Sequence, residues 1–75
     1  MLSNNSYQGT DEINADKADY MAKKFFHQSY SSLDIESTTL RDGVWFVRVI
    51  ASLFGRQSNQ TLAIEAKTGN IISVD

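Results

Sequence analysis

The chain has 75 residues, a formal net charge of −2, and neither cysteine nor proline. This length allows one domain, and without cysteine there can be no disulfide or thiolate metal site, so packing alone must hold the fold. The basic residues are scattered, and the longest apolar run is far shorter than the roughly 20 residues of a membrane span, so we expect no nucleic-acid partner and no membrane insertion.

Residues 1–12 are expected to form a flexible polar tail, because they lack apolar periodicity. They have neither the charged nor the apolar region of a signal peptide. As written, the sequence predicts a soluble cytoplasmic protein. A cell-envelope or secreted location stays open if an export signal was removed.

Residues 13–75 are expected to form a single domain that begins with a helix over residues 14–30. Acidic residues crowd the start of this segment and basic residues its end, which complements the helix dipole. At 1.5 Å per residue the helix would span roughly 25 Å, which matches strands of seven or eight residues. The apolar stripe that predicts it contains Ala18, Met21, Ala22, Phe25 and Ser29, with Phe26 at its edge.

A run of β-branched and aromatic residues over 43–51 indicates the central strand, and the preceding segment 33–39 alternates like a second strand. The turn between them allows two registers. A two-residue Asp-Gly loop would pair Arg41 with Val44, whereas a three-residue loop ending in Gly43 would pair Leu40 with Val44. We favour the three-residue loop, because it places Glu36 opposite Arg48 and apolar residues opposite one another.

Residues 53–59 break the strand pattern, and two further strands are expected over 60–66 and 70–74. The Lys67-Thr68-Gly69 loop between them repeats the three-residue geometry, and so pairs Ile64 with Ile72 and Leu62 with Val74. The predicted fold is therefore α+β in two layers, with one N-terminal helix packed on a four-stranded antiparallel sheet in the order α-β-β-β-β. The expected core face carries Leu33, Ile35, Trp45, Val47, Val49, Ala51, Leu62, Ile64, Ala66, Ile72 and Val74.

The opposite face of the sheet has nothing left in the chain to cover it. Two interpretations stay open: a surface for a partner or a second copy, because contiguous exposed apolar area usually marks contact, or ordinary surface hydrophobicity diluted by charges. We take Phe46, Ile50, Val44, Arg48 and Ile71 as the partner-binding residues. The same face is expected to carry Leu40, Ala63, Asp34, Glu36, Thr38 and Glu65.

The chemistry-bearing residues predict no catalytic residue, no metal site and no cofactor. His27 is the single histidine and falls opposite the apolar stripe, where a solvated role is typical. Lys67-Thr68-Gly69 matches a motif of penicillin-interacting serine enzymes, but the chain has no Ser-x-x-Lys, so the tripeptide is a turn. Trp45 on the core face indicates packing rather than a ligand pocket.

Two segments together resemble a PepSY or PepSY-like domain: Trp45-x-Val47-x-Val49, and Leu62-x-Ile64-x-Ala66 followed by Lys67-Thr68-Gly69-Asn70-Ile71. The resemblance spans about residues 14–75. The acidic residue often found before the family's Thr-Gly turn corresponds here to Glu65, and the family's typical signal peptide is not seen. The resemblance implies a small non-catalytic module, usually at the cell envelope, that binds or restrains peptidases or other partners.

Two functional hypotheses follow. The first is a protein-binding or regulatory module that acts through the exposed sheet face or by addition of a partner strand at a sheet edge. The alternative is a homodimeric structural or assembly protein that uses the same face. The partner is therefore another protein or a second copy of this chain.

Overall fold

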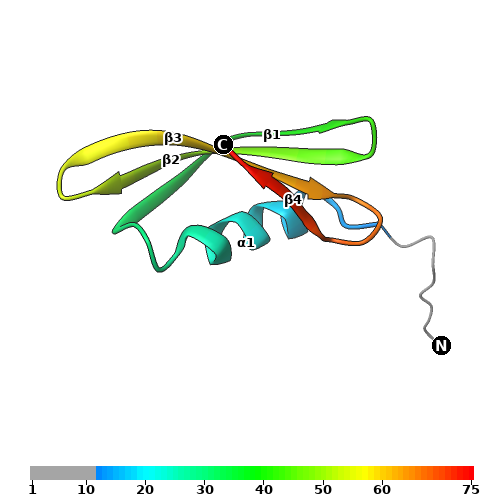
Figure 1. Cartoon of the computed structure of the whole chain (residues 1–75), viewed down its shortest axis with the longest axis horizontal. Coiled ribbons are helices and arrows are strands. Elements are labelled where there is room, and N and C mark those ends of the chain that lie inside the picture. Colours follow the sequence, from blue (N-terminus) through cyan, green and yellow to red (C-terminus); the bar gives the residue numbers. More distant parts are fainter. Residues whose placement is uncertain (1–11) are drawn as a thin grey trace.

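The computed structural model describes residues 12–75, and it confirms the predicted α-β-β-β-β order. The four strands form one antiparallel sheet in the order β1-β2-β3-β4, with the helix packed on one face of it (Figure 1). Residues 1–11, which include nearly all of the expected flexible tail, lie outside the described residues. The elements are α1 (Ala15–Phe26), β1 (Ser32–Arg41), β2 (Val44–Leu53), β3 (Arg56–Glu65) and β4 (Ile71–Val74).

Helix α1 begins where an asparagine caps it and ends four residues earlier than expected. The side-chain oxygen of Asn14 accepts a hydrogen bond from the backbone N–H of Lys17 at 2.8 Å, which satisfies one of the free donors of the first turn. After Phe26 the backbone forms a turn through Ser29, a residue type whose side chain competes for the backbone hydrogen bonds of a helix. The 12-residue helix spans about 18 Å, and the ten-residue strands about 33 Å, so the predicted match in length is wrong.

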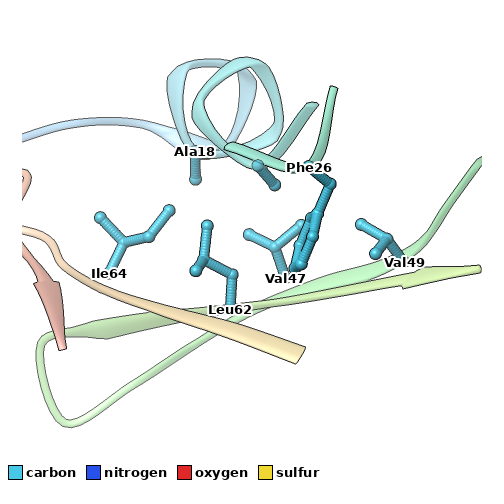
Figure 2. Packing of buried hydrophobic residues seen from close by; sticks show 7 residues of the cluster. Ala18, Phe26, Val47, Val49, Leu62 and Ile64 are labelled. Atoms are coloured by element: carbon cyan, nitrogen blue, oxygen red, sulfur yellow. The ribbon is translucent and has the colours of Figure 1, made fainter. Parts of the chain in front are cut away.

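The core is a narrow contact between three helix residues and the middle of the sheet. Ala18 and Ala22 are fully buried, and Phe26 is 4% exposed. Figure 2 shows the helix side chains directed at the aliphatic residues of β2 and β3. The stripe therefore follows the i, i+4 spacing through Phe26, and the prediction that Phe25 lies in the core is wrong, because Phe25 is 44% exposed. The strand residues in this core are Val47, Val49, Leu62 and Ile64.

Hydrogen bonds at Ile13 hold the segment before α1 against the sheet. The backbone N–H of Ile13 donates to the carbonyl of Ala66 at 2.9 Å, and the indole N–H of Trp45 donates to the carbonyl of Ile13, also at 2.9 Å. Trp45 also packs against the core. Its packing role agrees with the prediction from the sequence, and the hydrogen bond to Ile13 adds a role in positioning the helix start.

The hairpin between β1 and β2 combines features of the two predicted registers. The loop has two residues, Asp42 and Gly43, with φ angles of 52° and 76°, and Arg41 pairs with Val44, so the favoured three-residue loop is wrong. A β-bulge at Glu36 then shifts the register by one residue. Beyond the bulge Ile35 pairs with Val49, as predicted.

The two-residue loop moves two side chains to the helix side of the sheet. Leu40 pairs with Trp45 and Thr38 pairs with Val47, and residues paired in this way share a face. The Thr38 hydroxyl accordingly hydrogen-bonds the carboxylate of Asp19 on α1. The prediction that Leu40 and Thr38 lie on the outer face is therefore wrong.

Strands β2 and β3 form a long hairpin, where the sequence predicted an irregular segment over residues 53–59. Leu53 pairs with Arg56, and the turn consists of Phe54 and Gly55, with φ angles of 53° and 76°. Positive φ at both central residues is the pattern of a type I′ turn, which usually has asparagine, aspartate or glycine at the first position. Because Phe54 is not one of these residue types, residue preferences alone do not predict the turn. Its side chain is 91% exposed.

The last hairpin confirms one predicted pair and corrects the other. Leu62 pairs with Val74, but Ile64 pairs with Ile71 rather than with Ile72, because a second bulge makes Ile72 an extra residue. The loop places Gly69 at a φ of 77°, the left-handed conformation expected for it. Ile72 is 55% exposed, so its predicted place in the core is wrong.

Replacing Phe54 by asparagine is expected to stabilise the protein by about 1 kcal/mol. A non-glycine residue in the left-handed region costs roughly 1–2 kcal/mol, a cost that asparagine largely avoids, and the exposed ring loses little packing. Urea denaturation of the wild type and of Phe54→Asn measures the difference. A lower midpoint for the variant would show that the ring stabilises the turn.

Replacing Ala22 by leucine is expected to destabilise the protein by about 1–3 kcal/mol, because a fully buried alanine leaves no room for a larger side chain. Ala15→Leu is the matched control, since Ala15 is half-buried in the first helical turn. Thermal unfolding of the two variants should show a loss that is confined to Ala22→Leu. Equal stability of both variants would contradict close packing between helix and sheet.

Candidate functional site

Four of the five predicted partner-binding residues do share the outer face of β2. Val44, Phe46, Arg48 and Ile50 alternate along the strand with the buried residues Val47, Val49 and Ala51. The three apolar members are half-buried, and Arg48 is exposed. This face is therefore less apolar and less open than the sequence predicted.

The fifth predicted residue, Ile71, lies on the other side of the sheet. It pairs with Ile64, which is fully buried on the helix side, and paired residues share a face. The bulge at Ile72 is the cause, because the one-residue shift changes which residues of β4 face the helix. The prediction that Ile71 belongs with Phe46 and Ile50 is wrong.

The most exposed apolar side chains of β4 and α1 gather at one border of the sheet, beside Ile71. A shallow groove of about 360 Å³ lies here, between the flank of α1 and β4. Its lining residues are Tyr20, Met21, Lys24, Phe25 and Ile71. The exposed fractions are 55% for Tyr20, 44% for Phe25, 41% for Ile71, 55% for Ile72 and 46% for Val74. We call these five residues, together with Met21 and Lys24, the edge site.

The dimensions of the two layers explain why the edge site is open. An α-helix is about 10 Å across, while the outer axes of four strands lie about 14 Å apart. Helix α1 packs against β1 and β2, and its side chains reach the buried residues of β3. Strand β4 lies beyond that cover, which leaves its apolar side chains exposed.

The backbone of β4 is open on one side as well. Thr61 and Asp75 exchange two backbone hydrogen bonds of 2.9 Å each. In an antiparallel pair such bonded positions alternate with unbonded ones, so Val74, opposite Leu62, directs its N–H and C=O away from β3. Because β4 is the last strand of the sheet within residues 12–75, no other described strand pairs with these groups.

The two edges of the sheet differ in charge. Strand β1 carries Asp34, Glu36 and Arg41, and its bulge lies at Glu36; charges and bulges are features that discourage pairing at an edge. Strand β4 has the sequence Ile-Ile-Ser-Val, with no charged residue. An incoming strand thus meets less opposition at β4 than at β1.

The helix flank beside the groove is basic. The ammonium groups of Lys17 and Lys24 lie 5.6 Å and 5.9 Å from the centre of the Tyr20 ring. Both positions are favourable for cation–π contact, which keeps two positive charges near the mouth of the groove. An acidic group on a bound segment would be attracted there.

Within residues 12–75, no helix is long and apolar enough to cross a membrane. The same part of the chain contains no group of three or more histidine, cysteine, aspartate or glutamate side chains placed to hold a metal ion.

Comparison with protein-family models, with curated proteins and with solved structures returned no match. The resemblance to PepSY-like domains therefore stays a prediction.

The sequence did not predict the edge site, because several of its residues follow the spacing expected of core residues. Phe25 fell on the predicted helix stripe, and Ile72 and Val74 alternated like buried strand residues. One signal was present in the sequence: a single helix with small alanine residues at its centre can cover only part of a four-stranded sheet. Apolar residues that the helix does not cover are then expected on the last strand.

Proposed function

We propose that this protein is a small protein-binding module that accepts an extended segment of a partner as a fifth strand along β4. The observation that carries the proposal is the uncharged edge strand whose apolar side chains Ile71, Ile72 and Val74 are all exposed. Proteins usually protect such edges, and an unprotected one is a template for strand addition.

The edge site supplies the two kinds of contact that strand addition uses. The free N–H and C=O of Val74 can bond the backbone of the incoming segment, which provides affinity that is independent of sequence. Alternate side chains of that segment would enter the groove between Tyr20, Phe25 and Ile71, which provides selectivity. Because β4 has four residues, the paired stretch is short.

The charges of the groove indicate what the partner segment carries. Lys24 lines the groove and Lys17 lies beside its Tyr20 ring, so an acidic residue beside the apolar positions would be favoured. The proposed partner segment is therefore extended, apolar at alternate positions, and acidic at one end. The PepSY-like resemblance of residues 14–75 supports the same class of function, a non-catalytic module that binds other proteins.

Selection from a library of random linear peptides tests this proposal without a known partner. The selected peptides should contain alternating apolar residues, and they should shift the backbone NMR signals of β4 and of the Tyr20 side of α1. We expect Ile72→Lys and Val74→Lys to weaken binding at least about ten-fold, because a charge on the edge opposes strand pairing.

Thr39→Lys is the matched control, since it adds the same charge to an exposed strand position on the outer face. Circular dichroism must show that all three variants are folded. Peptides that bind Phe46 and Ile50 instead, or whose affinity is insensitive to both β4 substitutions, would contradict the proposal.

A second candidate function is favoured by the absence of charge on β4. Two copies of the chain can pair β4 with β4 in antiparallel orientation without repulsion between charged side chains, which would give a homodimer. Light scattering over a wide concentration range separates the candidates. A dimer that Ile72→Lys converts to a monomer supports the second candidate, and a monomer at all concentrations eliminates it.

A further inference from the structure

We propose that the outer face of the sheet binds a phosphate monoester in a groove between Arg41 and Arg48. This groove lies on the face opposite α1 and shares no residue with the edge site. It has a volume of about 290 Å³. Its lining residues are Ser37, Thr39, Arg41, Phe46, Arg48 and Thr61, of which two are cationic, three carry hydroxyl groups and none is acidic.

The strand register places these groups in rows across the sheet. Ser37 on β1 pairs with Arg48 on β2, and Arg48 pairs in turn with Thr61 on β3. A guanidinium group is thus flanked by a hydroxyl group on each side. In the next row Thr39 pairs with Phe46, and Arg41 lies one row further along. The bulge at Glu36 brings Ser37 opposite Arg48, so this arrangement depends on the irregular register.

The aromatic ring at the centre of the groove orients one of the arginines. The guanidinium carbon of Arg41 lies 5.4 Å from the centre of the Phe46 ring. Stacking on an aromatic ring holds the planar group and leaves its N–H donors free at the edges, where they can form paired bonds with an oxyanion. Phe46, half-buried on a central strand, is a rigid support for this purpose.

The second arginine has only a weak partner within the protein. The Nε atom of Arg48 lies 3.9 Å from a carboxylate oxygen of Glu36, and the two side chains are 54% and 47% exposed. An exposed pair at this distance contributes little. An anion with two charges and several oxygens is a stronger partner, because it can accept bonds from Arg41, Arg48 and the adjacent hydroxyl groups together.

Phosphate fits this set of donors better than carboxylate does. A phosphate monoester carries about −1.5 to −2 charges at neutral pH and presents three acceptor oxygens. Two guanidinium groups match that charge, and three hydroxyl groups can serve the remaining oxygens. Such a group can belong to a phosphorylated side chain of a protein or to a small phosphorylated molecule.

NMR titration of the whole chain tests the proposal, with inorganic phosphate, O-phosphoserine and glycerol 3-phosphate as probes at constant ionic strength. We expect saturable shifts confined to the groove. Arg41→Gln and Arg48→Gln should each weaken binding about ten-fold or more, because each removes bonds to a charged group. Phe46→Leu should weaken it by releasing Arg41, and Glu36→Gln should strengthen it by removing the competing carboxylate.

Arg56→Gln is the matched control, since Arg56 lies beside the β2–β3 turn and outside the groove. Tighter binding of O-phosphoserine than of glycerol 3-phosphate assigns the site to phosphorylated protein side chains, and the reverse assigns it to small molecules. Shifts that do not saturate, or that Arg56→Gln reduces as much as Arg48→Gln does, overturn the proposal. Ile72→Lys should leave phosphate binding unchanged, so the two proposed sites stand or fall separately.

Discussion

The close contact of Ala18 and Ala22 with the middle of the sheet is the constraint on which the rest of the structure depends. Both residues are fully buried, and their small side chains allow the helix to lie close to β2 and β3 while Phe26 fills the space at its end (Figure 2). A short helix held in this way covers a narrow part of the sheet. This contact forms the core, and β4 and the tip of the β2–β3 hairpin lie outside it (Figure 1).

Hydrophobic periodicity predicted the element order, the core of β2 and β3, and the outer-face positions of Phe46 and Arg48. It did not predict the two β-bulges, because a bulge inserts one residue without an obligatory sequence signal, and each shift changes which side chains face the helix. Ile71 was assigned to the wrong face for this reason, and Leu40 because the loop before β2 has two residues rather than three. The tight turn at Phe54 was not predicted, because a bulky residue rarely adopts the positive φ that this position requires. The candidate site was therefore predicted in part, as the outer face of β2, and missed at β4.

The sheet presents two surfaces of opposite character. Along β4 the side chains of Ile71, Ile72 and Val74 are exposed and apolar, and the N–H and C=O of Val74 point away from β3, an arrangement suited to an extended protein segment. On the outer face the arginines and hydroxyl groups of three strands surround Phe46, an arrangement suited to an anion. Because the surfaces use different residues, the two proposed binding events do not exclude each other. Strand β3 contributes to both, through the backbone that pairs with β4 and through Thr61 on the outer face.

Amide hydrogen exchange at β4 is the decisive measurement. It tests whether this edge of the sheet is open and whether it receives a partner strand. In the isolated chain the Val74 amide should exchange much faster than the Ser73 amide, because antiparallel alternation directs the Ser73 N–H toward β3 and the Val74 N–H toward solvent. A bound strand should protect Val74 and leave Ser73 little changed. A Val74 amide that is already protected in the isolated monomer, or that gains no protection from a bound peptide, would contradict the account.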